Sequence, residues 1–267
     1  MSGASVWGDY NTPGDPSSGR RLPDKAAIRI WAGEIEGRHQ LIEKRIYDVP
    51  GTYTWTRPDD CTCVYVEVLS AGASGGSCLE ASIGYLSVGT GGGGGGASSA
   101  WVTLADGLGA TEQVQVGAGG APNPPGGYDG NPGGDSWFGS GSPTGSGVGW
   151  ASCTGAEQGH RVDNTQSNNN EGGAGGNRFG GAGLQVAGCS GGAGIIKTPG
   201  IAISGRGGSA TGPYGGAGGK EALSYGNGHG GSRGGGGSGG FSKDGLPVGG
   251  AAGGPGGDGM VVVWAFR

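Results

Sequence analysis

The sequence predicts a mainly β fold, with a small β-core, packed extended helices of three residues per turn, connecting loops and one short N-terminal α-helix. Three observations predict it. Glycine makes up 73 of the 267 residues, where about 7% is usual. Short runs of alternating apolar residues stand before and after the glycine clusters, as strands do. One stripe of apolar residues at helical spacing precedes all of them.

The helix is expected between Pro23 and Gly37. Proline suits the first helical position, and glycine suits the residue after the last turn. Ile28, Trp31 and Ile35 follow the i, i+3, i+7 spacing of a single helical stripe. Because a helix of about 14 residues is marginal alone in water, we expect this stripe to pack on its own domain, on copies of itself or on another protein.

The β-core is expected from segments rich in β-branched and aromatic residues. These are residues 51–56, 63–69, 101–104, 112–116 and 260–266. The core is therefore predicted from residues 51–69, 98–117 and 258–267, so that the two ends of one domain meet in it. The predicted domains are 1–45, an attachment and oligomerisation segment, and 46–267, a glycine-rich domain.

The glycine clusters lie in residues 70–97 and 117–257. A flexible linker is one interpretation of such a composition. Aliphatic and aromatic residues keep interrupting the clusters, however, and a strand follows them. Extended helices of three residues per turn have no internal hydrogen bonds, so their backbone groups must bond to neighbours. Glycine at the contact faces permits that packing. The sequence lacks the strict G-X-Y period of collagen, which excludes a collagen triple helix.

Composition and charge exclude several functions. The net charge of −5 and the absence of a basic run argue against a nucleic-acid partner. The N-terminus lacks the pattern of a signal peptide, and no apolar run is long enough for a membrane helix. The five cysteines are odd in number and widely spaced, which argues against a disulfide framework and fits folding in a reducing cytoplasm. Cys61 and Cys63 lack the second matched pair of a metal site, so we expect no metal and no cofactor.

Catalysis finds no support in the sequence. The histidines are His39, His160 and His229, and none has a nucleophile or carboxylate beside it in a recognised spacing. No paired carboxylates stand at a spacing that indicates a glycosidase. We therefore expect a protein that is not an enzyme.

Three loops are less dominated by glycine and carry aromatic, amide and charged groups, namely residues 142–170, 194–204 and 211–230. Such groups on Gly/Ser-rich loops suit adaptable recognition. The alternative is that they are ordinary loops whose aromatic residues cover the glycine helices. The candidate binding residues are Trp150, His160, Arg161, Asn168, Asn169, Lys197, Tyr214, Tyr225 and His229.

The order of these segments resembles the glycine-rich domain of phage and prophage tail proteins. The resemblance rests on residues 51–58 and 64–68, then 114–120 and 133–139, and finally 254–264. It covers about residues 51–267. It implies a β-core topped by packed polyglycine II helices, as in the distal adhesins of some T-even-like phages, with variable tip loops for receptor binding.

The N-terminus resembles the first segment of many phage tail-fibre and tailspike proteins. The resemblance rests on residues 16–19 and 23–29 together with Trp31. It implies attachment to the virion, commonly as trimers, with Ile28, Trp31 and Ile35 as candidate attachment residues. Little stalk separates this segment from the glycine-rich domain, which implies a short tip or fibre.

Together these observations predict a bacteriophage tail-fibre or tail-tip protein that is assembled in the host cytoplasm and located in the virion. Its expected partners are other phage tail proteins and a host surface receptor, either a polysaccharide or an outer-membrane protein, with a homotrimer as the expected assembly. The alternatives are a structural fibre or cap protein without receptor binding, and a tailspike that degrades polysaccharide.

Overall fold

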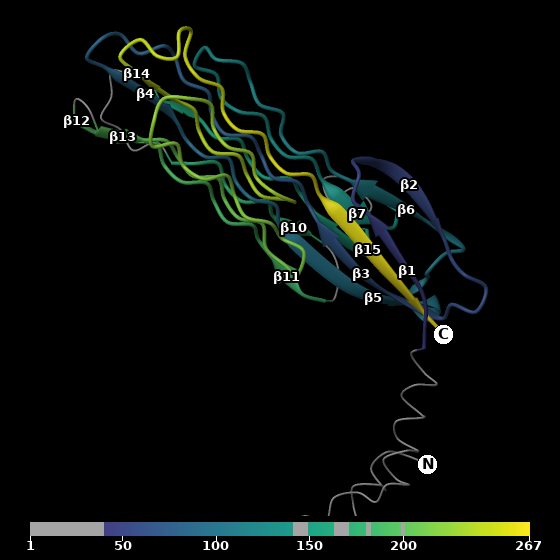
Figure 1. Cartoon of the computed structure of the whole chain (residues 1–267). Helices are drawn as coiled ribbons and strands as arrows, with labels where there is room; N and C mark the ends of the chain where they lie inside the picture. The colour runs from purple at the N-terminus through teal and green to yellow at the C-terminus, as the bar shows by residue number, and fades with distance from the viewer. Residues whose placement is uncertain (1–39, 141–148, 163–170, 180–182, 199–200) are drawn as a thin grey trace, which may run out of the picture.

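The computed structural model describes residues 40–140, 149–162, 171–179, 183–198 and 201–267. The described part is elongated (Figure 1). Two five-stranded sheets lie at one end, here called the sandwich end, together with the start of the described chain and the C-terminus. Two small sheets lie at the opposite end, here called the distal end. Long extended segments without regular sheet pairing run between the two ends (Figure 1).

The sheets are antiparallel throughout, and their strand orders are β1-β15-β3-β5-β11 and β10-β8-β7-β6-β2 at the sandwich end, with β14-β4-β9 and β12-β13 at the distal end. The strands are β1 (Leu41–Tyr47), β2 (Gly51–Thr56), β3 (Cys63–Leu69), β4 (Leu86–Gly89), β5 (Ala97–Thr103), β6 (Thr111–Val116), β7 (Ser136–Phe138), β8 (Ala151–Cys153), β9 (Arg161–Val162), β10 (Arg178–Phe179), β11 (Gln185–Val186), β12 (Ile195–Thr198), β13 (Ile201–Ile203), β14 (Phe241–Lys243) and β15 (Met260–Phe266). A 3₁₀ helix, η2 (Leu104–Asp106), follows β5.

The prediction of a mainly β protein is confirmed. The expected strands at 51–56, 63–69 and 260–266 are β2, β3 and β15 with the same bounds. The expected strand at 112–116 is part of β6, and the one at 101–104 covers the end of β5 and the first residue of η2. The expected helix between Pro23 and Gly37 lies outside the described residues and finds no support. The part of the chain that the structure describes contains no helix beyond the single turn of η2.

β1 was not predicted, and its composition explains why. It is an edge strand that pairs only with β15, and five of its seven residues are exposed. Glu43, Lys44 and Arg45 interrupt the apolar alternation, as charges on edge strands commonly do to prevent pairing with other chains. The expected domain boundary between residues 45 and 46 falls inside this strand.

The main core lies between the two large sheets. Alternate residues of each strand point inward because side chains alternate between the faces of a sheet. Trp55 and Phe138 are fully buried there, with ring centroids 5.7 Å apart in an edge-on arrangement. The buried members of this core are Trp55, Cys61, Val64, Val66, Val68, Ala100, Val102, Leu108, Val114, Val116, Phe138, Ala151, Cys153, Val261, Val263 and Ala265.

The glycine-rich segments are held by hydrogen bonds that repeat every three residues. Residues 70–78 show the pattern in full. The amides of residues 70, 73 and 76 donate to the carbonyls of 96, 93 and 90, those of 71, 74 and 77 to 134, 131 and 128, and those of 72, 75 and 78 to 257, 254 and 251. Each of the three neighbouring segments runs antiparallel to residues 70–78. Every third residue of 70–78 faces the same neighbour. The segment therefore completes one turn in three residues.

Residues 89–96 lie at the centre of this packing and have six neighbours. Their amides donate to residues 234–240, 157–160 and 189–192, and their carbonyls accept from residues 70–76, 173–176 and 205–211. The segment thus donates to three neighbours and accepts from three others. These bonds satisfy amide and carbonyl groups of residues 89–96 that would otherwise be buried without partners. The glycine-rich segments are thus an ordered lattice.

Glycine is required in this lattice because neighbouring backbones touch. A Cβ atom on any residue from Gly91 to Gly96 would overlap a backbone oxygen of an adjoining segment. Serine hydroxyls complete the lattice by accepting further backbone amides: the amide of Asn131 donates to Ser74 Oγ at 2.7 Å, and the amide of Tyr128 donates to Ser77 Oγ at 2.7 Å.

Candidate binding surface

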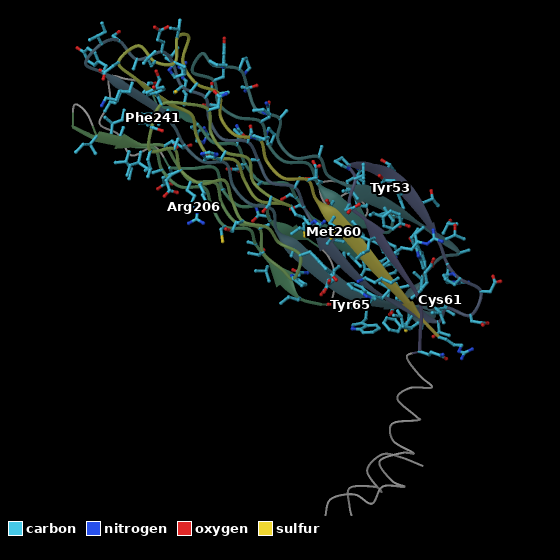
Figure 2. All side chains as sticks on the ribbon, in the orientation of Figure 1. Tyr53, Cys61, Tyr65, Arg206, Phe241 and Met260 are labelled. Carbon is cyan, nitrogen blue, oxygen red and sulfur yellow. The ribbon has the colours of Figure 1, made fainter. Side chains whose placement is uncertain are left out.

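The distal end is built from loops that join the glycine segments to short strands. Residues 79–85 lead into β4, residues 244–250 follow β14, and residues 223–225 precede a bridge from Gly226 to Phe241. These strands pack on a small core of their own. Its buried members are Leu86, Val88, Val162, Ala202, Ala222 and Phe241. Figure 2 places Phe241 at the distal end, far from Met260 and Tyr65 on the sandwich.

Hydrogen bonds hold the first two of these loops against each other. The amide of Gly249 donates to Glu80 Oε2 at 2.6 Å, and the amide of Gly84 donates to Asp244 Oδ1 at 2.9 Å. The amide of Gly245 donates to the carbonyl of Ala81 at 2.6 Å. Asp244 has a φ of 51°, which is uncommon for a residue other than glycine. Carboxylate acceptors from each loop therefore bond to the backbone of the other.

These loops expose aliphatic side chains to an unusual degree. Ile83 is 87% exposed, Val248 81% and Leu223 71%. Tyr85, Tyr225 and Leu246 are also exposed. Single exposed apolar residues are ordinary, whereas a group of them on adjoining loops indicates a contact surface. We call Ile83, Tyr85, Leu223, Tyr225, Leu246 and Val248 the distal apolar group.

Sequence reasoning found only Tyr225 of this group. The others stand in short loop motifs such as Ser82-Ile83-Gly84 and Pro247-Val248-Gly249. The signal that was present is a lone aliphatic residue between turn-forming residues, where no strand or helix could bury it. That signal is weak without the fold, because a single aliphatic residue carries no periodicity.

The predicted binding residues are distributed along the whole molecule. Arg161 lies in β9 and Tyr225 lies beside β14, both at the distal end. His160 adjoins Arg161, with its Nδ1 3.6 Å from Asp129 Oδ2, and the amide of Arg161 donates to Asp129 Oδ1 at 2.9 Å. Lys197 is in β12. Asn168 and Asn169 lie outside the described residues.

Three of the predicted residues lie elsewhere. Trp150 packs against the sandwich core. Tyr214 stacks on Trp264 of the sandwich with ring centroids 6.4 Å apart. His229 is exposed within the lattice, where its amide donates to Ser238 Oγ at 2.8 Å. The structure thus brings His160, Arg161, Lys197 and Tyr225 to the distal end and separates the others from them. The attachment candidates Ile28, Trp31 and Ile35 are outside the described residues.

The cysteines are free thiols, and four of the five are buried. Burial raises the pKa of Cys78 to about 11, and burial likewise raises the pKa of Cys153. The thiol of Cys61 donates to the carbonyl of Cys63 at 3.3 Å. Within the described ranges, no group of three or more histidine, cysteine, aspartate or glutamate side chains could hold a metal ion.

No helix among residues 40–140 and the later described ranges is long and apolar enough to cross a membrane.

Most of the chain matches a protein-family model. Residues 48–266 match the model of the glycine-rich domain. The chain belongs to this glycine-rich domain family. The comparison with curated proteins found no match. The matched residues begin directly after β1 and include every other strand of the sandwich end, the lattice and the distal loops. The glycine-rich domain is therefore the described part of the chain without the edge strand β1.

Proposed function

We propose that this glycine-rich domain protein is a binding protein of a bacteriophage tail, in which packed polyglycine II helices present distal loops to a host surface. The observation that carries the proposal is the separation of the two ends. Both termini of the described chain are at the sandwich end, and the distal apolar group is at the other (Figure 1). A rigid spacer between an attachment end and an exposed apolar group is the arrangement that an adhesin requires.

The lattice supports this proposal because it makes the spacer stiff. In residues 70–78 every backbone amide donates to a neighbouring segment. Three residues per turn, no bonds within the helix and glycine at the closest contacts define polyglycine II packing by analogy with the crowded axis of collagen. Loops fixed at the end of such a body lose little entropy on binding, which favours affinity.

The phage assignment rests on the resemblance of the strands and glycine segments to tail proteins. In that setting the chain would be assembled in the host cytoplasm and located in the virion tail. Residues 1–45, with Ile28, Trp31 and Ile35, would attach it to other tail proteins as a homotrimer. A polysaccharide or an outer-membrane protein of the host would be the receptor. No cofactor, enzymatic step or nucleic-acid partner is part of the proposal.

The test is adsorption competition with the purified full chain. Host cells are saturated with the protein, phage are added, and unadsorbed phage are counted. We expect blocked adsorption. The double variant Ile83→Asp, Val248→Asp should lose the block because it places charges in the distal apolar group. The matched control Leu104→Asp changes a residue that is also exposed, at the sandwich end, and should block fully.

Unchanged adsorption in the presence of folded protein would overturn receptor binding. If particles assembled without this chain also fail to form tails, the structural fibre or cap protein would be the correct function. Clearing of surface polysaccharide by the purified protein would instead establish a degrading tailspike.

A further inference from the structure

Aromatic side chains form a row on the outer face of the sheet β1-β15-β3-β5-β11. Trp264, Tyr65 and Trp101 are register partners on three adjacent strands. Ring centroids are 5.5 Å apart between Tyr65 and Trp264 and 5.0 Å apart between Tyr65 and Trp101. We call these three residues the aromatic row. In Figure 2, Tyr65 lies on the side of the sandwich opposite Tyr53.

The row is accessible and extended by neighbours. Trp101 is 51% exposed, and Tyr65 and Trp264 are half-buried. Phe266 adds a fourth ring 5.2 Å from Trp101, and Tyr214 stacks beside Trp264. Alternation along each strand would allow polar residues at these positions on a solvated face. The three rings lie outside the main core between the sheets. Trp264 packs at the edge of a second cluster of buried residues, Leu69, Ala97, Met260 and Val262.

Polar groups border the rings. Glu67 lies two residues from Tyr65 on the same face, and the hydroxyl of Tyr65 donates to Glu67 Oε1 at 3.2 Å. Lys44 Nζ lies 5.2 Å from the centre of the Trp264 ring. Burial raises the pKa of the Glu67 carboxyl, while the Tyr65 hydroxyl and the charge of Lys44 lower it. A carboxylate accepts several hydrogen bonds, and the Tyr65 hydroxyl uses one of them.

A recess adjoins the row at Glu67. Its lining is mostly apolar and includes Leu69, Ala97 and Met260. The Ser99 and Thr211 hydroxyls that border it are already bonded, since Ser99 Oγ accepts the amide of Leu184 and Thr211 Oγ1 donates to the carbonyl of Ala187. The site therefore has flat aromatic faces beside a carboxylate and an apolar recess. A sugar ring has the complementary surface, with an apolar face of C–H groups and an edge of hydroxyls that donate and accept.

We propose that the aromatic row, together with Glu67, binds a neutral saccharide chain. Successive sugar rings stack on Trp264, Tyr65 and Trp101, whose spacing is close to the length of one sugar unit. Glu67 accepts hydrogen bonds from sugar hydroxyls. This site is separate from the distal apolar group, and it stands whether or not the distal loops bind a receptor.

The dimensions favour a saccharide over a protein partner. Adjacent strands are about 4.8 Å apart, so three rings span about 10 Å. A stable protein interface buries about 800 Å² on each partner, far more than a row one residue deep supplies. The rings are also tilted by 37° and 40° from their neighbours. A twisted sheet produces such tilts between neighbouring rings. Successive sugar rings of a helical saccharide chain are rotated relative to one another in the same way.

Isothermal titration calorimetry of the full chain tests the proposal. The probes are three neutral oligosaccharides, maltohexaose, cellohexaose and chitohexaose. We expect saturable binding of at least one. Trp101→Ala and Tyr65→Ala should each weaken that binding at least tenfold, and Glu67→Gln should weaken it several-fold while preserving shape. Tyr128→Ala changes an exposed tyrosine outside both the aromatic row and the distal apolar group. It is the matched control and should bind as the parent does.

Each variant is first compared with the parent by circular dichroism and thermal unfolding, and Glu67→Gln keeps the proposal testable if an alanine variant fails to fold. The absence of saturable binding for all three probes overturns the proposal, as does binding that Trp101→Ala and Glu67→Gln leave unchanged. Self-association of the parent that Trp101→Ala abolishes, without any saccharide binding, would make the row an interface between copies of the chain and also overturns it.

Discussion

Gly91 and Arg206 approach so closely that a Cβ atom on Gly91 would lie 1.8 Å from the carbonyl oxygen of Arg206. Gly91 also donates its amide to Gly192 at 3.0 Å. The position lies in the central segment 89–96, where six neighbouring segments leave no room to shift. The glycine content of this chain is thus a packing requirement of the lattice as well as a property of its turns.

Gly91→Ala should therefore destabilise the protein strongly. Overpacking typically costs about 1–3 kcal/mol, and we expect at least about 3 kcal/mol because the obstructing atom is backbone. Urea unfolding followed by circular dichroism measures the change. Gly230→Ala is the control, since its Cβ would come no closer to any atom than 3.1 Å, at the ring of Pro255. Equal losses of stability in the two variants would contradict the lattice as described.

A second prediction concerns the serine hydroxyls that complete the lattice. Ser74 is fully buried, and its Oγ accepts the amide of Asn131 at 2.7 Å. Ser74→Ala leaves that amide without its acceptor, which costs about 1–3 kcal/mol when the donor is buried. The exposed Ser224 supplies the control, and Ser224→Ala should shift the urea midpoint little. A midpoint for Ser74→Ala that equals the parent's would show that water replaces the hydroxyl.

Thiol accessibility gives a third prediction. Cys189 is exposed, whereas Cys61, Cys63, Cys78 and Cys153 are buried. Because the thiolate is the reactive form and must be reached by the reagent, iodoacetamide at pH 8 should modify Cys189 alone in the folded protein. Mass spectrometry of peptides identifies the labelled residues, and urea-unfolded protein should be labelled at all five. Rapid native labelling of Cys78 or Cys153 would contradict the burial described.

The sequence predicted most of the longer strands of the sandwich and the lattice only in outline, and it missed β1, β7, β8, β10 and β11. Strands β2, β3 and β15 were found because apolar alternation is a local signal. The short strands β4, β9 and β14 were missed, since two to four residues carry too little periodicity. The bonding partners in the lattice are far apart in sequence, as with Ala73 and Gly237, so no local pattern could identify them.

The candidate binding surface was predicted less well for the same reason. Tyr214 and Tyr225 are eleven residues apart in one loop region, yet one stacks on Trp264 of the sandwich and the other lies at the distal end. A segment that runs the length of the lattice separates them. Proximity in sequence therefore says little about proximity in a fold whose connecting segments are long and extended.

The expected oligomer can be tested independently of the receptor. We predict that the full chain is a homotrimer held by the stripe Ile28, Trp31 and Ile35. The double variant Ile28→Asp, Ile35→Asp should be monomeric because it places charges on that stripe, while Lys25→Ala should not change the mass. Light scattering coupled to size-exclusion chromatography measures the molar mass of the assembly. A parent that is monomeric at high concentration would contradict the trimer.

Alkaline pH should destabilise the folded protein, and Cys78 supplies a measurable part of the effect. Burial raises the pKa of Cys78 to about 11 in the folded state, compared with about 8.5 for an unperturbed thiol. Between these values the unfolded chain has lost the proton and the folded chain keeps it. Stability therefore falls as pH rises through this window, by up to about 1.4 kcal/mol per pH unit from this thiol.

Below about pH 8 both states hold the proton, and the contribution of Cys78 is constant. Urea unfolding at pH 8, 9 and 10 measures the slope. Cys78→Ala, compared with its own stability at pH 8, should show a shallower decline than the parent because this ionisation is gone. Tyrosines and the other buried thiols contribute equally to both proteins, so the difference between the two slopes isolates Cys78. Identical slopes would mean that the thiol is solvated in the folded state.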